Sequence, residues 1–230
     1  MQIVMGLSGG MDSVTLLGLL LEQGYHVHCC LFYYGSKHNK WENKAARKIV
    51  DFYRQYDRPI TANFVNLAEA MDSFQSNLLQ SGGEIPEGHY TEESMHQTVV
   101  PSRNLIMASI MAGMAESIGA QKIALGVHSG DHFIYPDCRT EFVKALDTTI
   151  FLSSDKQVEV ITPLSNYDKT SILTAGYSCD PQVPYYLTRT CYKDQELSCG
   201  KCGSCTERLQ AFRSIGKKDP IPYEMPLGVM

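Results

Sequence analysis

The start of the chain constrains its fold more than any other segment. The apolar run Ile3-Val4-Met5 is followed by Ser8-Gly9-Gly10-Met11-Asp12-Ser13 and then by the apolar run 14–20. This order predicts a β-strand, a tight turn and a helix. Such a junction directs backbone N–H groups and the positive end of a helix dipole at one spot, which suits a phosphate. Gly9 and Gly10 lack a Cβ, so the backbone there can approach an anion closely.

The side chains of this turn add chemistry to its backbone. The hydroxyl groups of Ser8 and Ser13 can donate hydrogen bonds, and Asp12 can hold the Mg²⁺ that accompanies a nucleotide. The turn has neither the lysine of a Walker motif nor the spacing of a dinucleotide-binding G-x-G-x-x-G motif. Ser-Gly-Gly alone fits an ordinary strand-to-helix turn, whereas the whole six-residue string is far more specific.

Strand-like and helical patterns alternate along the chain. Strands are predicted at residues 2–5, 26–32, 60–65, 122–127 and 158–162, and helices at 12–22, 41–55, 104–118 and 140–151. This alternation predicts an α/β fold with an open, mostly parallel, doubly wound sheet over residues 1–188. Ligands of such sheets bind beyond the carboxyl ends of the strands, where the turn at 8–13 would lie.

Composition narrows the functional classes. Of the 230 residues 43% are hydrophobic, which is enough for a substantial core, and the net charge is −5. An acidic chain disfavours a broad surface for nucleic acid. No apolar run reaches the length of a membrane span, and the first strand leaves no room for a signal peptide, so we expect a cytoplasmic protein.

The segment 68–100 interrupts the alternation. It is too long for a simple connection, so we expect a functional loop or lid, with a plain surface loop as the alternative.

Two later strings carry candidate site residues. Arg103 would emerge at the start of a buried helix and could grip a phosphate or carboxylate, whereas Asn104 there fits an ordinary helix cap. The loop that follows residue 127 contains Asp131 and Asp137, which could accept hydrogen bonds from a purine-like base or ligate Mg²⁺.

Four cysteines near the end of the sequence form the strongest signal after the first turn. Their spacing, with glycines between them, suits one tetrahedral structural Zn²⁺ held by Cys191, Cys199, Cys202 and Cys205. An iron–sulfur cluster is the competing interpretation, because C-x2-C-x2-C also occurs in cluster-binding sequences. We therefore expect a metal-binding region with a helix at 189–218, followed by a tail at 219–230.

These strings together resemble the QueC family of ATP pyrophosphatase-type enzymes. The similarity rests on the turn at 8–13, Glu87-Gly88-His89-Tyr90, the string 99–104, Gly130 to Arg139, and Cys199 to Leu209. Ser36-Lys37-His38 departs from the family, which usually has a glutamine there, and so does the loop 176–183.

The resemblance implies an ATP-dependent ligase. It would convert 7-carboxy-7-deazaguanine and ammonia to 7-cyano-7-deazaguanine through adenylated intermediates. It implies ATP binding by Leu7, Ser8, Gly9, Gly10, Met11, Asp12, Ser13, Val14, Thr15, Leu16 and Leu17. Asp12, Arg103, Asp131 and Asp137 would serve as catalytic residues. Mg²⁺ and one structural Zn²⁺ are the implied metals, small molecules the implied partners, and a homodimer the expected assembly.

Three alternatives stay open. A family member that stops at the amide would have the same motifs. Another ligase with the same first turn, amidating or tRNA-modifying, would show a different acceptor. A non-enzymatic zinc module would bind nucleic acid through residues 191–205 and the nearby lysines and arginines.

Overall fold

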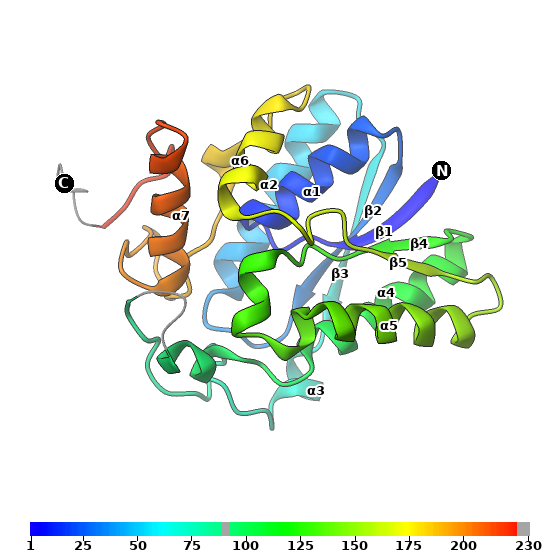
Figure 1. Cartoon of the computed structure of the whole chain (residues 1–230), viewed down its shortest axis with the longest axis horizontal. Coiled ribbons are helices and arrows are strands. Elements are labelled where there is room, and N and C mark those ends of the chain that lie inside the picture. Colours follow the sequence, from blue (N-terminus) through cyan, green and yellow to red (C-terminus); the bar gives the residue numbers. More distant parts are fainter. Residues whose placement is uncertain (89–92, 225–230) are drawn as a thin grey trace.

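One parallel sheet organises the part of the chain that the structure describes (Figure 1). The computed structural model describes residues 1–88 and 93–224, without the side chains of residues 93, 94, 131 and 132. The strand order is β3-β2-β1-β4-β5, and each neighbouring pair is parallel. The strands are β1 (Gln2–Gly6), β2 (His26–Tyr33), β3 (Ile60–Asn66), β4 (Lys122–Ala124) and β5 (Glu159–Ile161). The predicted α/β sheet is confirmed.

Helices cover both faces of this sheet (Figure 1). The α-helices of the described chain are α1 (Met11–Glu22), α2 (Asn39–Gln55), α3 (Ala68–Met71), α4 (Arg103–Ile118), α5 (Thr140–Ser153), α6 (Lys169–Ser178) and α7 (Gly203–Ser214). One hydrophobic cluster joins β1 and β2 to α1, α2 and α6, and another joins β4 and β5 to α4 and α5. Within the described residues no helix combines the length and apolar character needed to span a membrane.

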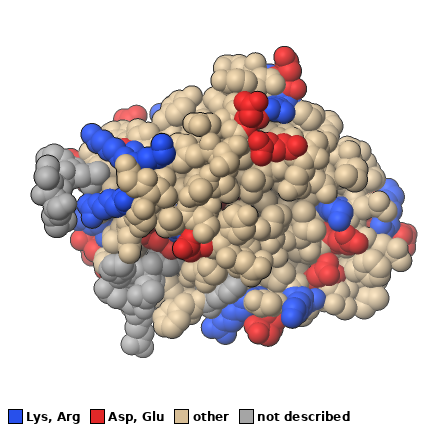
Figure 2. Space-filling view, turned by 45° about the horizontal axis from the view of Figure 1, so that its top comes forward, with Lys and Arg blue, Asp and Glu red and all other residues tan. Residues whose placement is uncertain are grey.

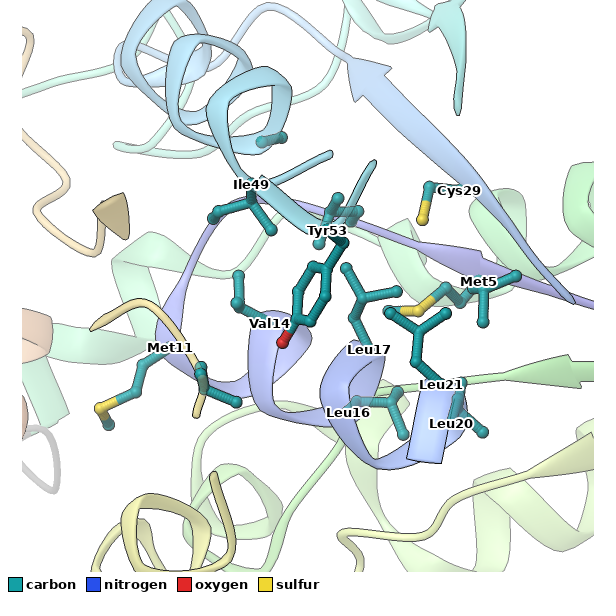
Figure 3. Packing of buried hydrophobic residues seen from close by; sticks show 14 of the residues in the cluster. Met5, Met11, Val14, Leu16, Leu17, Leu20, Leu21, Cys29, Ile49 and Tyr53 are labelled. Carbon is teal, nitrogen blue, oxygen red and sulfur yellow. The ribbon is translucent and has the colours of Figure 1, made fainter. Parts of the chain in front are cut away.

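Most residues of helix α1 are buried, and its apolar side chains pack with residues of β1, β2 and α2 (Figure 3). Val14, Leu16, Leu17 and Leu20 have no exposed surface, and the ring of Tyr53 from α2 lies against this row. Burying such aliphatic side chains contributes about 1.5–3 kcal/mol each. The turn before α1 is therefore attached to one of the most firmly packed elements of the fold.

Two elements next to the site differ from the sequence-based prediction. Strand β4 ends at Ala124 instead of 127: Leu125 still donates a backbone hydrogen bond of 3.0 Å to Ile161 of β5, and residues 125–127 line a cavity. Helix α6 was not predicted, since residues 169–178 are rich in threonine, serine and glycine, which are weak helix formers. The side chain of Asp168 caps this helix by accepting a hydrogen bond of 2.7 Å from the backbone N–H of Ser171.

A buried arginine fastens the C-terminal region to the sheet domain. The guanidinium of Arg208, on α7, donates two hydrogen bonds to Asp219, of 2.7 and 2.9 Å, and one to the carbonyl of Tyr185. Both members of this ion pair are fully buried. Residues 189–218 therefore pack closely on residues 1–188, and the boundary between the two parts stays a prediction.

Charges are mixed on the face shown in Figure 2. Basic and acidic side chains lie in small groups toward its edges, around a broad area of other residues. The described residues on this face form no wide basic surface, in keeping with the net charge of −5.

Candidate active site and metal centre

A cavity of about 240 Å³ opens at the carboxyl ends of the central strands. It is lined by Gly6 and Leu7 after β1, by Phe32 of β2, and by Ala124 and Leu125 at the end of β4. The chain leaves β1 toward β2 on one side and returns to pair with it through β4 on the other. Open α/β sheets bind their ligands at this point, where the strand order reverses.

The predicted phosphate-binding turn forms the floor of this cavity. Ser8, Gly10, Met11, Asp12 and Ser13 line it. The hydroxyl groups of Ser8 and Ser13 share a hydrogen bond of 3.0 Å, and the Ser13 hydroxyl donates to the Gly10 carbonyl at 3.1 Å. The hydroxyl groups and the free N–H groups at the start of α1 therefore converge on one small region, as an anion site requires.

Gly9 holds this turn against α2. Its φ is +80°, which favours glycine, and a Cβ there would lie 2.8 Å from both the Ala46 amide nitrogen and the Glu42 carbonyl oxygen. A side chain at this position would push the turn away from α2. The glycine is thus required by backbone shape and by close packing together.

Residues 14–17, which we also expected to bind ATP, pack in the core beneath the turn. Val14, Thr15, Leu16 and Leu17 are buried in the core and do not line the cavity. The Thr15 hydroxyl lies 2.8 Å from the hydroxyl of Tyr185. The structure thus separates a lining group, residues 7, 8 and 10–13, from a supporting group.

Asp12 lies at the centre of a charged cluster. Its Oδ2 is 2.6 Å from Nζ of Lys169 and 3.8 Å from Nε2 of His128. Burial acts to raise the pKa of Asp12, but Lys169 and His128 outweigh it and hold the pKa below its usual value, so the carboxylate is ionised. The second oxygen, Oδ1, is buried and has no hydrogen-bond partner among the described residues. An ionised carboxylate with one unused oxygen beside an anion site fits a divalent cation.

Arg103 reaches the cavity from the start of α4, as predicted. Its Nη1 donates a 3.4 Å hydrogen bond to the hydroxyl of Tyr34, and its guanidinium lies over the rings of Tyr34 and Tyr135. Burial acts to lower its pKa, but Tyr34, Tyr135 and Asp137 more than offset this and raise it well above the usual value. Arg103 therefore presents a permanent positive charge to a ligand.

Asp137 does not lie where we expected it. Its carboxylate accepts a 2.8 Å hydrogen bond from the backbone N–H of Asn104, and it is not among the described residues that line the cavity. Ser102 precedes α4 without a side-chain cap, so Asp137 supplies the missing acceptor at this helix start. Asn104 therefore does not cap this helix as expected, because its own backbone N–H donates to Asp137. Asp137 thus positions α4, and with it Arg103.

Asp131, the other aspartate expected near the ligand, belongs to a short 3₁₀ helix, Ser129–Phe133. Its side chain lies outside the described part of the structure, and its role stays a prediction. His89 and Tyr90, part of the family string near residue 87, also fall outside the described residues.

The turn after β2 supplies cavity residues that the sequence did not single out as a site. Asn39 accepts hydrogen bonds of 2.9 Å from the backbone N–H groups of Tyr34 and Ser36, which fixes the turn. Tyr34, His38 and Glu42 then line the cavity. Burial lowers the pKa of His38 to about 3, with Arg103 and Arg189 acting in the same direction, so this imidazole is neutral.

The four predicted metal ligands come together. The Sγ atoms of Cys191, Cys199, Cys202 and Cys205 all lie within 4.8 Å of one another, and all four residues are buried. The Cys199 and Cys205 sulfurs are 3.9 Å apart, close to the roughly 3.8 Å that tetrahedral Zn–S bonds of about 2.3 Å require. Backbone N–H groups of residues 201 and 202 point at the Cys199 sulfur, at 3.4 and 3.3 Å. The cluster is suited to hold one metal ion.

Arg189 joins this cysteine cluster to the predicted phosphate-binding turn. Its backbone N–H donates to the Gly9 carbonyl at 2.8 Å. Its guanidinium donates to the carbonyls of Lys193, Gln195 and Glu196, between the first two cysteines. The loop that the metal would order is therefore tied to the floor of the cavity.

Local sequence carried no signal for several of these groups. Lys169 begins a helix that was not predicted, and Glu42 lies within the polar pattern of α2. Only their place in the sequence indicated a role, since both residues follow predicted strands and so come near the edge of the sheet where the turn at 8–13 was expected.

The comparisons with known proteins decide the family. The model of "Queuosine biosynthesis protein QueC" matches residues 2–216. The chain belongs to the QueC family. A 7-cyano-7-deazaguanine synthase from Caldicellulosiruptor saccharolyticus is 44% identical, over 99% of this chain and 97% of its own length. The synthase of the same name from Methanoregula boonei is also 44% identical, over 97% of this chain and all of its own. This QueC chain is therefore an enzyme of queuosine biosynthesis by family.

Solved structures bear out the fold of this QueC chain. An NMN synthetase from Francisella tularensis has a TM-score of 0.53 at 15% identity, covering 94% of this chain and 77% of its own. The U34-tRNA thiolase NcsA from Methanococcus maripaludis has a TM-score of 0.52 at 15% identity, covering 93% and 64%. At these identities the likeness establishes the architecture alone.

Proposed function

We propose that the chain converts 7-carboxy-7-deazaguanine and ammonia to 7-cyano-7-deazaguanine at the expense of ATP. The observation that carries this proposal is one cavity in which the QueC turn, with Ser8, Asp12 and Ser13, faces Arg103 and Lys169. A pyrophosphate site opposite a buried guanidinium suits attack by a carboxylate on the α-phosphate of ATP.

The reaction would proceed in four steps. The substrate carboxylate attacks the α-phosphorus, and the bond to pyrophosphate breaks. Ammonia adds to the acyl carbon and displaces AMP, giving the amide. The amide oxygen attacks a second ATP, again releasing pyrophosphate. Loss of two protons from the nitrogen and departure of AMP then give the nitrile.

The residues of the turn would stabilise the leaving pyrophosphate. N–H groups at the start of α1 and the hydroxyl groups of Ser8 and Ser13 are preorganised donors, so they need no rearrangement as charge develops. Lys169 adds a positive charge beside Asp12. Arg103 would hold the α-phosphate or the attacking carboxylate through paired N–H donors.

Two metals complete the proposal. Asp12, through its unpartnered Oδ1, would hold Mg²⁺, which supplies charge neutralisation on the triphosphate when bound. The four cysteines would hold one structural Zn²⁺. Their close spacing favours a single ion, because four iron ions and four sulfides need more room between the thiolates. Metal analysis and the visible absorption spectrum of purified protein distinguish the two interpretations.

The decisive experiment combines the purified protein with ATP, Mg²⁺, ammonium and the carboxylic acid. We expect pyrophosphate release that depends on the acid, and a nitrile product identified by mass spectrometry. Accumulation of the amide as the final product would favour the alternative of a truncated reaction. Pyrophosphate release at background level would refute the proposal.

Assembly and location complete the proposal. We propose a cytoplasmic homodimer that acts on free small molecules without contacting nucleic acid directly. Light scattering in solution tests the dimer. Salt-dependent binding of RNA would contradict the last expectation.

A further inference from the structure

Glu42 is a buried carboxylate that the proposed chemistry does not use. It projects from α2 into the cavity, and 16% of its side chain is exposed. Its Oε2 accepts a 3.2 Å hydrogen bond from Asn39, and its Oε1 is 3.5 Å from Nε2 of the neutral His38. Two carboxylate oxygens offer about four acceptor sites, so most of this capacity is unused in the described structure.

Glu42 and Asp12 are the acidic residues among the described groups that line the cavity. Asp12 lies beside Lys169 at the phosphate-binding turn. Glu42 lies on the β2 side of the turn, with Tyr34 and His38 from the turn after β2, whereas Lys169 and His128 flank Asp12 on the β4 and β5 side. A ligand that extends from the phosphate site toward β2 would therefore meet the carboxylate of Glu42.

The charges around Glu42 restrict what this ligand part can be. Arg103 and Arg189 are close enough to lower its pKa, although burial prevails and raises the pKa to about 7. Two nearby guanidinium groups disfavour a third cation such as ammonium. A neutral group with two adjacent N–H donors meets no such repulsion and supplies the hydrogen bonds that the carboxylate lacks.

We propose that Glu42 recognises the guanine-type edge of the substrate, accepting hydrogen bonds from the ring N–H and the adjacent amino group. This inference rests on the proposed function, which supplies a deazaguanine as substrate. Asn39 serves as a positioning residue, since it fixes the turn at 34–36 and donates to Glu42 at once. Glu42 thereby determines specificity and takes no part in bond making.

The test pairs two substrates with two variants. The substrates are 7-carboxy-7-deazaguanine and the same molecule without its amino group, 7-carboxy-7-deazahypoxanthine. The wild type should prefer the first by roughly 100-fold in kcat/KM, since a site built for two donors rejects a ligand that lacks one. Glu42→Gln should lose about 100-fold on the first and less than about 10-fold on the second, because one donor now faces an amide NH₂.

Matched controls keep the result interpretable. Glu42→Asp retains the carboxylate and should keep the preference for the amino-bearing substrate. Asp51→Asn changes an exposed acid on the same helix and should behave as the wild type. Binding of a non-hydrolysable ATP analogue, measured by calorimetry, should be unchanged in Glu42→Gln, which shows that the site is folded.

An unchanged preference between the substrates in Glu42→Gln would overturn the inference. If the KM for ammonium rose at the same time, Glu42 would instead belong to the ammonia site. Calorimetry of the free acid with wild type and Glu42→Gln separates this inference from the proposed function. Weaker binding to the variant supports the role of Glu42 even without turnover, and equal binding refutes it.

Discussion

Burial raises the pKa of Glu42 to about 7 from an ordinary 4.5, so the folded protein holds this proton more tightly than the unfolded chain. The free energy of unfolding therefore falls as pH rises from about 4.5 to about 7, since the unfolded state releases the proton first. Ionising Glu42 thus lowers the stability of the fold near neutral pH, and hydrogen bonds from the N–H donors of a ligand would offset this cost.

We predict that Glu42→Gln removes this deficit. Its free energy of unfolding, relative to wild type, should rise between pH 5 and pH 8 by on the order of 2–3 kcal/mol. Urea denaturation at pH 5, 6, 7 and 8 measures the difference, with Asp51→Asn as the control. A difference that stays constant across this range would contradict the prediction.

At the residue scale, site residues that are neighbours in the sequence could be predicted, and site residues that come from separate segments could not. The string 8–13 carries its chemistry in six neighbouring positions and was predicted correctly as a turn before a helix. Glu42, Lys169 and Arg189 come from three distant segments, and only the folded sheet brings them to one cavity. Asp137 has a side chain that could bind a ligand, and it lies in the expected loop. Its carboxylate instead accepts a hydrogen bond from the backbone N–H of Asn104 at the start of α4.

Among the elements, α6 is short but contributes directly to the candidate site. It starts with Lys169, which contacts Asp12, and packs between α1 and α7. Its first turn depends on Asp168, whose pKa is lowered by the hydrogen bonds from Ser171.

We predict that Asp168→Ala lowers the free energy of unfolding by about 1 kcal/mol at neutral pH. The carboxylate stabilises the fold above its unfolded pKa, and this contribution is lost as pH falls through the lower pKa of the folded state. The variant should therefore approach the stability of the wild type in acid. Guanidinium denaturation tests this, with the exposed Thr174→Ala of the same helix as comparison.

Strongly patterned elements could be predicted from sequence, and weakly patterned ones could not. Helices α1, α2, α4 and α5 were placed within three residues of their observed ends. Their long apolar faces pack on the sheet. Helix α6 has poor intrinsic propensity and forms because Ile172 and Leu173 are buried against the core. Tertiary packing overrode local preference there.

For the whole molecule, the cysteine cluster and the turn at 8–13 form one connected unit. Arg189 bonds to the carbonyls of the cysteine loop with its side chain and to Gly9 with its backbone. Disorder in the loop between Cys191 and Cys199 would therefore spread to the turn at 8–13.

We predict that Cys199→Ser reduces the bound metal and lowers the melting temperature by about 10 °C or more, because metal binding supplies folding free energy. It should also weaken binding of a non-hydrolysable ATP analogue. Mass-spectrometric metal analysis, differential scanning calorimetry and titration calorimetry measure these effects. Cys179→Ala changes a buried cysteine away from the cluster and should retain the metal. Normal nucleotide binding by metal-free Cys199→Ser would show that the two sites are independent.

The central position of β1 also sets the order in which a ribosome can complete this enzyme. β1 can pair with β2 soon after both leave the ribosome. Its other edge stays unpaired until β4 is made, and the hydrogen bond from Arg189 to the Gly9 carbonyl can form only later still. A nascent chain thus carries an open edge of β1 until about half of its residues have been made, and chaperones would be needed during that period. A chain that ends before residue 189 lacks the hydrogen bond from the Arg189 N–H to the Gly9 carbonyl, so we expect such a chain not to bind an ATP analogue in titration calorimetry.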